Sequence, residues 1–231
     1  MIHILATGTS RGIGAATLAA LDRPGVRIVG HGTASGIAAD FSDPAAPAKL
    51  WDSALAELGA IDVLINNAGV FEANPIERDD AAWSAAWERT MRINLTAAAE
   101  LSRMAVRHWQ ERGQGGRIIN IASRAAHRGD SPAHWHYAAA KAGMVAMTKT
   151  IARGYARDGI LAFAICPGFT MTGMADDYLA SRDGDKLLAD IPLGRVAMPE
   201  EVAEMARWLA LDAPASMTGA VLDVNGASYV R

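Results

Sequence analysis

The chain has 231 residues, 51% of them apolar, and a formal net charge of −3 from 22 basic and 25 acidic side chains. The interspersed charges argue against nucleic-acid binding, and no apolar run reaches the roughly 20 residues of a membrane helix. One cysteine, Cys166, cannot form an internal disulfide framework, and the N-terminal segment lacks a recognisable signal peptide, so we expect a cytoplasmic protein.

Short apolar segments alternate with longer segments of helical periodicity along the whole chain. Strands are predicted at residues 2–7, 26–30, 61–67, 116–123, 160–166 and 220–224, with a very brief strand ending near Asp40. Helices are predicted at residues 12–22, 46–59, 79–91, 92–112, 137–157 and 199–211. The segment 33–39 is too short for a helix. Continuously apolar strands separated by helices indicate an α/β fold, a doubly wound, Rossmann-like parallel sheet with helices on both faces. No linker divides it, so we expect one domain over residues 1–231.

The segment TGTSRGIG (residues 7–14) follows the first predicted strand and opens the first helix, with glycines at positions 8, 12 and 14. Glycine lets a phosphate approach the main chain, and the free N–H groups at a helix start attract anions. The spacing differs from G-x-G-x-x-G, and a tight turn without a ligand fits the same residues. The strand–loop–helix context favours a dinucleotide site.

The end of the second predicted strand bears on the choice between NAD and NADP. Folds that prefer NAD place an acidic residue there for the ribose 2′-hydroxyl, whereas this chain has Gly30, His31, Gly32 and Thr33. Arg11, in the glycine loop, either pairs with a 2′-phosphate or is a solvated loop residue. We expect NADP and keep NAD as the alternative.

Tyr137 and Lys141 stand four residues apart in HWHYAAAKAG, so they are neighbours on a helix. A phenol has a pKa of about 10 and needs a lowered pKa to exchange protons near neutrality. A nearby ammonium group favours the phenolate. Taken alone, the pair is better explained as an ordinary surface tyrosine and lysine on a helix.

The motifs occur in one order: the glycine loop, NNAG (66–69), Ser123, Y-x-x-x-K and PG (167–168). In this set, over essentially the whole length, the chain resembles the single-domain short-chain dehydrogenase/reductases. The resemblance implies an NAD(P)-dependent enzyme that interconverts a ketone and a secondary alcohol.

The resemblance also implies roles for four catalytic residues. Tyr137 is the general acid or base, Ser123 hydrogen-bonds the substrate oxygen, and Lys141 lowers the Tyr137 pKa and binds the nicotinamide ribose. Asn94 supports a water-linked proton path to the lysine. The alternatives are a turn-forming serine at 123 and a helix kink or satisfied polar residue at 94.

The same resemblance assigns the cofactor contacts, and it leaves Asn66 to stabilise the sheet. The cofactor residues are Gly8, Ser10, Arg11, Gly12, Ile13, Gly14, Thr33, Asp40, Phe41, Asn67, Ala68, Gly69, Tyr137, Lys141, Pro167, Gly168, Thr170 and Thr172. No metal ligands are expected.

Substrate specificity is expected in two segments, residues 124–136 and a lid near 171–193. The basic and aromatic residues of the first segment either recognise an anionic or polar carbonyl compound or are surface and subunit contacts. A free sugar, polyol, hydroxy acid or other secondary alcohol stays open as the substrate.

In general look the chain is nearest to bacterial ketoacyl-carrier-protein reductases, which hold an acidic carrier protein with arginines. The matching positions here are Gln114 and Asp158, which argue against such a partner. A non-catalytic dinucleotide-sensing module is a further alternative, because fold does not fix function. We expect a small-molecule substrate, no nucleic-acid or membrane partner, and a homotetramer, or a homodimer, with helices 92–112 and 137–157 at a two-fold interface.

Overall fold

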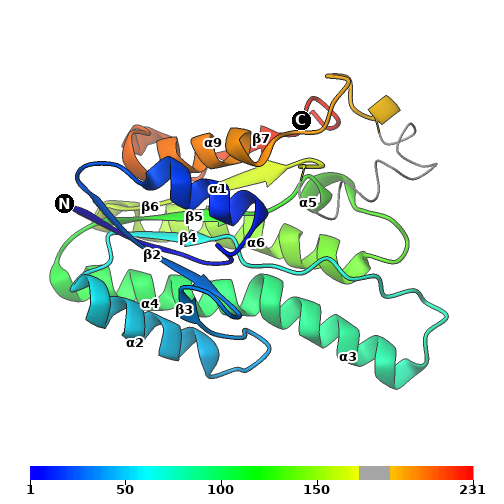
Figure 1. Ribbon diagram of the computed structural model, residues 1–231, viewed down its shortest axis with the longest axis horizontal. Helices are drawn as coiled ribbons and strands as arrows, with labels where there is room; N and C mark the ends of the chain where they lie inside the picture. The colour runs from blue at the N-terminus through cyan, green and yellow to red at the C-terminus, as the bar shows by residue number, and fades with distance from the viewer. Residues whose placement is uncertain (172–187, 231) are drawn as a thin grey trace.

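The computed structural model describes residues 1–171 and 188–230, and at its centre lies a seven-stranded parallel sheet (Figure 1). The strands lie side by side in the order β3-β2-β1-β4-β5-β6-β7. They are β1 (Ile2–Ala6), β2 (Val26–Gly32), β3 (Ile37–Ala38), β4 (Val63–Asn66), β5 (Gly116–Ile121), β6 (Ile160–Pro167) and β7 (Val221–Val224). The chain starts near the middle of the sheet and winds outward to both edges, which confirms the doubly wound, Rossmann-like prediction.

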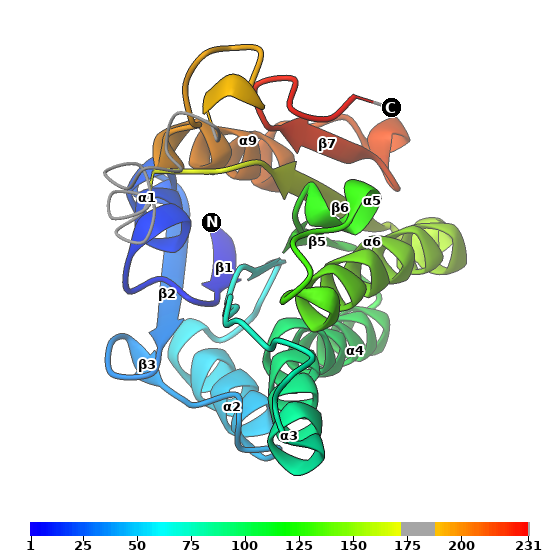
Figure 2. The same ribbon diagram turned by 90° about the vertical axis from the view of Figure 1, so that its right-hand side faces the viewer.

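Helices cover both faces of this sheet (Figure 2). On one face lie α1 (Gly12–Leu21) and α9 (Pro199–Leu211), and on the other lie α2 (Ala46–Leu58), α4 (Ala97–Arg112) and α6 (Trp135–Tyr155). The remaining helical elements are α3 (Asp80–Met91), η1 (Arg92–Thr96), α5 (Ala125–Arg128), η2 (Ala156–Asp158) and η3 (Ala215–Met217).

The strand side chains alternate between two hydrophobic cores. Leu5 and Ile118 pack with α2 and α4, whereas their neighbours Ile4 and Ile119 pack with α9. All four side chains are fully buried. Because both faces of the sheet are covered, a strand needs apolar residues at successive positions, which is the pattern seen in the sequence.

The predicted elements differ from the structure mainly at their ends. β3 has two residues and ends at Ala38 rather than near Asp40, and only residues 33–36 separate it from β2, as the short segment implied. The helices predicted at 79–91 and 92–112 are α3 and α4, but the π-helical turn η1 joins them. α6 begins at Trp135 rather than at Tyr137.

Polar side chains inside the sheet are paired across neighbouring strands. Asn66 lies opposite Asn120 in the register of β4 and β5, and its Nδ2 donates to Asn120 Oδ1 at 2.8 Å. Asn66 Nδ2 also contacts Ser102 Oγ of α4 at 3.1 Å, and Asn120 Nδ2 donates to Thr148 Oγ1 of α6 at 2.8 Å. Asn66 therefore stabilises the sheet, as expected, by linking β4 to β5 and to α4, and its side chain is buried.

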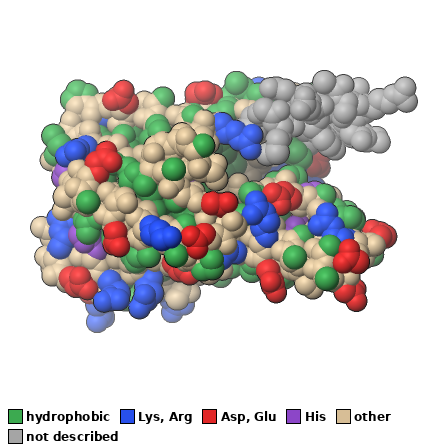
Figure 3. Space-filling view, turned by 60° about the horizontal axis from the view of Figure 1, so that its bottom comes forward, with side chains coloured by type: hydrophobic (Ala, Val, Ile, Leu, Met, Phe, Trp, Pro, Cys, Tyr) green, Lys and Arg blue, Asp and Glu red, His purple; other side chains and the backbone are tan. Residues whose placement is uncertain are grey.

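On the face drawn in Figure 3, acidic and basic side chains are interspersed over most of the surface, and several basic side chains gather along the lower left edge. Among the helices that the structure describes, none is both long and apolar enough to cross a membrane.

Candidate active site

The four residues predicted to be catalytic lie at the carboxyl ends of the central strands, the end of the sheet that faces the viewer in Figure 2. Ser123 follows β5, Tyr137 and Lys141 stand in the first two turns of α6, and Asn94 lies in η1. Gly69 lies between two of them, because a Cβ there would be 3.2 Å from Asn94 Oδ1 and 3.6 Å from Lys141 Nζ. The fold therefore brings the four together from separate parts of the chain.

The Ser123 side chain lies near the Tyr137 phenol and lowers its pKa. Ser123 Oγ also accepts a hydrogen bond from Ala125 N at 3.1 Å, which fixes its position at the start of α5. Burial raises the pKa of Tyr137 to about 12, against the lowering effect of Ser123. The phenol is therefore protonated at neutral pH and has a proton to donate.

Lys141 lies on the same side of α6, with Nζ 5.8 Å from the centre of the Tyr137 ring. The side chain is buried, and Nζ donates to Ile121 O at 2.8 Å. Burial lowers the pKa of Lys141 to about 8. Burial outweighs every other influence on the phenol, and the lowering of the Tyr137 pKa by Lys141 stays a prediction.

An aromatic cluster borders Tyr137, and sequence reasoning missed one of its members. Phe71, just after the NNAG segment, meets the Tyr137 ring edge-on with centroids 4.8 Å apart. His134 stacks on Phe71 at 3.9 Å with an angle of 4° between the rings. Phe71 is 38% exposed, which is unusual for a phenylalanine and is explained by its place at the edge of the site. Its only sequence signal is its position two residues after Gly69.

Asn94 is fully buried in the π-helical turn η1. Its Oδ1 accepts from Val70 N at 2.7 Å and its Nδ2 donates to Val70 O at 2.8 Å. The side chain thus holds the segment after β4 in place, which is the satisfied-polar alternative named from the sequence. The same geometry keeps Asn94 beside Lys141, as the catalytic interpretation requires.

The glycine loop is interlocked with the segment after β4. Asn67 Nδ2 donates to Thr7 O at 3.0 Å and to Gly8 O at 2.8 Å. A Cβ on Gly14 would lie 2.0 Å from Gly8 O, and a Cβ on Gly8 would lie 2.6 Å from Ala68 Cα. Gly8 also has a φ of +66°, which favours glycine. Asn67, Ala68, Gly8 and Gly14 therefore lie together, as predicted.

The start of α1 suits a pyrophosphate. Its first turn carries no acidic side chain, and no side chain caps its N–H groups. Ser10 and Arg11 are exposed beside Gly12, whereas Ile13 packs into the core and presents only its main chain. Free N–H groups and a positive helix end attract phosphate, so this loop fits the cofactor.

His31 lies beneath the glycine loop, and sequence reasoning did not place it there. Its Nδ1 accepts from Gly8 N at 3.3 Å and its Nε2 donates to Ala39 O at 2.9 Å, so one neutral tautomer satisfies both contacts. Phe41 stacks on the ring at 4.4 Å. Burial lowers the pKa of His31, which keeps it neutral. The end of β2 therefore carries a neutral imidazole and no acidic side chain. An acidic side chain there would repel the 2′-phosphate of NADP.

Two residues predicted to contact the adenosine part of the cofactor, Thr33 and Asp40, are exposed near His31. Thr33 is exposed directly after β2. Asp40 is also exposed, and its Oδ1 accepts from Ser42 N at 2.9 Å, which lowers the Asp40 pKa. Both side chains are accessible to a ligand at this edge of the sheet.

The predicted nicotinamide loop leaves the end of β6 at Pro167. A Cβ on Gly168 would lie 2.9 Å from Asn225 Cα, so this loop packs closely on the C-terminal segment. Thr170 is buried, and its Oγ1 donates to Gly168 O at 3.2 Å. Thr172 and most of the predicted lid lie outside the described residues.

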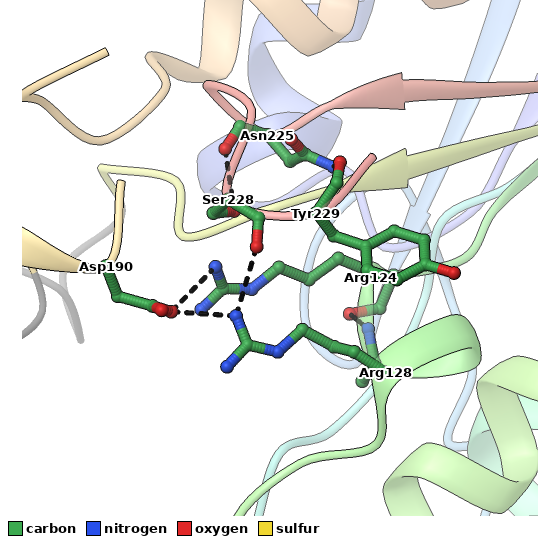
Figure 4. A network of polar contacts seen from close by, with 8 residues as sticks. Arg124, Arg128, Asp190, Asn225, Ser228 and Tyr229 are labelled. Atoms are coloured by element: carbon green, nitrogen blue, oxygen red, sulfur yellow. Dashed lines mark hydrogen bonds and ion pairs between the residues drawn. The ribbon is translucent and has the colours of Figure 1, made fainter. Parts of the chain in front are cut away.

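Two arginines follow Ser123 and share one carboxylate (Figure 4). Arg128 contacts Asp190 at 2.7 Å and Arg124 contacts the same oxygen at 3.5 Å. Arg128 also donates to Ser228 O at 3.1 Å, and the Arg124 guanidinium lies 5.0 Å over the Phe169 ring. Arg124 is only 9% exposed, and burial, together with the charge of Arg128, lowers its pKa. Two positive charges thus meet one negative charge beside the predicted catalytic serine.

Other residues of the segment 124–136 face α3. His136 is buried and stacks on Trp87 with centroids 6.4 Å apart. Trp135 is exposed and lines, with Trp83, a surface cavity of about 410 Å³. For these residues the structure favours the surface or subunit-contact interpretation over substrate recognition.

A family model and several named proteins are similar to the chain over most of its length. The model, described as enoyl-(acyl carrier protein) reductase, matches residues 8–227. The cis-4-hydroxycyclohexanecarboxylate dehydrogenase of Sinomonas cyclohexanicum is 36% identical over 95% of this chain and 93% of its own length. A 3-oxoacyl-(acyl-carrier-protein) reductase of Vibrio cholerae is 33% identical, with 98% and 96% covered. An uncharacterized short-chain type dehydrogenase/reductase of Sinorhizobium fredii is 34% identical, with 94% and 83% covered.

Proposed function

Since the chain belongs to the short-chain dehydrogenase/reductases, and is thus an NAD(P)-dependent oxidoreductase that interconverts ketones and secondary alcohols, we propose that Tyr137 exchanges the proton of this reaction. The observation that carries the proposal is the arrangement around Tyr137: Lys141 is buried on the same side of α6 with Nζ 5.8 Å from the centre of the Tyr137 ring, and Ser123 lies near the phenol. A non-catalytic sensor has no need of this arrangement.

The nicotinamide cofactor supplies or accepts the hydride. During reduction, Ser123 Oγ hydrogen-bonds the carbonyl oxygen and Tyr137 donates its proton to that oxygen as charge develops there. A phenol with a pKa of about 12 is protonated at neutral pH, so it holds the proton that reduction of the carbonyl needs. Lys141, with a pKa of about 8, is suited to return a proton to the phenolate near neutrality. Its remaining hydrogen-bond donors suit the ribose hydroxyls of the cofactor.

NADP is the preferred cofactor in this proposal. No acidic side chain stands at the end of β2, where His31 is neutral and Thr33 offers a hydroxyl. Arg11 is exposed at the start of α1 and forms no ion pair with any residue in the described ranges 1–171 and 188–230. It is therefore available to a 2′-phosphate.

The substrate in this proposal is a small carbonyl compound that carries a carboxylate, or the corresponding hydroxy acid. Among residues 1–171 and 188–230, Arg124 and Arg128 share one carboxylate, that of Asp190, so a substrate carboxylate near Ser123 balances the excess charge. One relative is named for a hydroxycyclohexanecarboxylate, another for an acyl-carrier-protein substrate. Against the second, Gln110 Nε2 donates to Asp158 Oδ2 at 2.8 Å, and Gln114 beside this pair brings no positive charge. The homotetramer, or homodimer, stays a prediction.

The test of Tyr137 is hydride transfer measured at saturating NADPH with a panel of keto acids and neutral ketones. Tyr137→Phe is expected to lower kcat by roughly 10²–10⁴-fold, the usual contribution of a positioned acid. Tyr155→Phe, at the exposed far end of the same helix, is the matched control and retains activity. Full turnover by Tyr137→Phe would show that another group donates the proton.

The cofactor preference is tested with the same assay. We expect kcat/KM to be higher with NADPH than with NADH, and Arg11→Gln to reduce the NADPH value by roughly 10–100-fold, the range of a charged hydrogen bond, while sparing NADH. Arg23→Gln, beyond the other end of α1, is the control. A higher value with NADH for the wild type would overturn the preference.

A further inference from the structure

Three side chains with metal-binding atoms meet where α5, β6 and β7 come together. They are His127, Cys166 and Asp223, and their ligand atoms all lie within 4.8 Å of one another. His127 Nε2 lies 3.5 Å from Cys166 Sγ. None of the three takes part in the reaction steps derived above.

The fold fixes this grouping through the register of the sheet. Cys166 and Asp223 are direct partners in the parallel pairing of β6 and β7, so their side chains leave the same face of adjacent strands. Cys166 is fully buried in the strand. His127 comes from α5, and its ring is stacked on Tyr229 with centroids 5.4 Å apart and 5° between the planes. This stacking holds the imidazole in one orientation.

The three donor atoms are a thiol sulfur, an imidazole nitrogen and a carboxylate oxygen. Zn²⁺ binds these donors at about 2.0–2.3 Å in a tetrahedron, which places ligand atoms roughly 3.5 Å apart. The His127–Cys166 separation already has this value. Asp223 is the exposed member of the grouping, and its carboxylate lies within 4.8 Å of both other ligand atoms. Harder ions such as Mg²⁺ prefer oxygen and are disfavoured by the sulfur.

The grouping is also accessible to an ion. A surface cavity of about 690 Å³ is lined by Asp223, Tyr229 and other residues of the C-terminal segment 221–230. Asp223 is the member of the grouping that borders this cavity. The cavity side also leaves one coordination position for water or a small anion.

We propose that His127, Cys166 and Asp223 form a binding site for one divalent ion of the Zn²⁺ class, with a fourth position open to the cavity. Binding replaces the thiol proton by the ion and releases that proton to solvent. The ion then links β7 to β6 and α5, so it stabilises the folded state over the unfolded chain.

The test uses the full chain, freed of metal with a chelator and titrated with Co²⁺ and Zn²⁺. We expect one equivalent to bind by calorimetry, and Co²⁺ to produce the near-ultraviolet thiolate band and the visible bands of tetrahedral coordination. Cys166→Ser is expected to abolish the thiolate band and to weaken binding by at least the roughly 10–100-fold that an outer-shell loss costs. Zn²⁺ is also expected to raise the Tm of the wild type.

Two further variants keep the result interpretable. Asp223→Asn changes an exposed side chain, so it tests the site without threatening the core, and it is expected to weaken Zn²⁺ binding and reduce the Tm rise. His3→Gln is the control, because His3 and Asp62 form a pair at 3.1 Å without a sulfur ligand. The proposal is overturned if Co²⁺ gives no thiolate band, or if affinity is unchanged in both Cys166→Ser and Asp223→Asn.

Discussion

The proposed cofactor side and the proposed substrate side of the site hold their residues in different ways. On the cofactor side, the glycine loop and the segment after β4 interlock through the main chain, and neither Gly8 nor Gly14 leaves room for a Cβ. On the substrate side, residues are held in place by side-chain contacts, namely the Arg128–Asp190 ion pair and the stacked rings of Phe71 and His134. All four side chains are partly exposed.

The two sides therefore differ in how strongly they restrict the amino-acid sequence. A pyrophosphate needs close main-chain approach and free N–H groups, so the cofactor side accepts few sequences. Side-chain charges and rings on a partly exposed surface are replaceable one at a time at small cost in stability, so the substrate side is where specificity is able to change.

The sharpest test of the cofactor side is Gly14→Ala. The added methyl group would lie 2.0 Å from Gly8 O and 2.6 Å from Asn67 Nδ2, and both partners are held by the hydrogen bonds of the loop. We expect the free energy of unfolding to fall by about 3 kcal/mol or more, at the upper end of overpacking effects, and NADPH binding to be lost. Urea unfolding and a fluorescence titration with NADPH measure the two effects.

Gly154→Ala is the matched control for that change. Gly154 lies in α6, and a Cβ there would meet no atom within 4 Å. Removing a helical glycine without crowding is expected to raise the free energy of unfolding by about 0.5–1 kcal/mol. Equal effects of the two substitutions would mean that the glycine loop is not interlocked as described.

Local patterns predicted the fold around the proposed cofactor side well. The strands and helices follow from apolar runs and helical periodicity, and the glycine loop joins the first strand to the first helix, as its context indicated. Each of these features is local, because a strand, a helix or a glycine turn depends on a few consecutive residues. The π-helical turn η1 was not predicted, because its residues RINLT fit an ordinary helix equally well.

Contacts between distant segments could not be predicted in the same way. His31 beneath the glycine loop and Phe71 against Tyr137 depend on how β2, β4 and α6 are placed in space. The Tyr137 pKa is a stronger example, because the sequence shows a neighbouring lysine but not the burial that raises the pKa to about 12. Spacing alone also gave no indication of the His127–Cys166–Asp223 grouping.

Lys141 lies where the two sides meet, and its burial makes stability depend on pH. Its pKa is about 8 in the folded protein and 10.5 as the ordinary value, so the unfolded chain binds more protons between these pH values. Stability is therefore expected to rise from pH 8 toward pH 10.5, by at most about 3 kcal/mol for a shift of this size. Tyr137 opposes this trend only above about pH 10, where an unfolded phenol ionises.

Lys141→Met isolates that contribution. Urea unfolding of both proteins between pH 7 and 9.5 is expected to show a rise for the wild type and a flatter profile for the variant. Met retains the buried length but loses the ammonium group and its hydrogen bond to Ile121 O, so the comparison uses the slope with pH and not the absolute stability. Parallel profiles would show that Lys141 is not the group responsible.

The smallest effect is expected on the substrate side, from Arg128→Gln. Arg128 is about one-third exposed, with a side-chain exposure of 37%, and an ion pair of this kind contributes less than about 1 kcal/mol to stability. The variant should therefore unfold almost like the wild type. For a keto acid, however, kcat/KM is expected to fall roughly 10-fold, because a charged hydrogen bond to the substrate is lost, while the methyl ester of the same acid is unaffected. Arg128→Lys retains the charge and should keep part of the preference for the acid. If Arg128→Gln lowered kcat/KM equally for acid and ester, the arginine would be holding Asp190 and the C-terminal segment in place rather than recognising the substrate, and the contrast between the two sides would no longer extend to specificity.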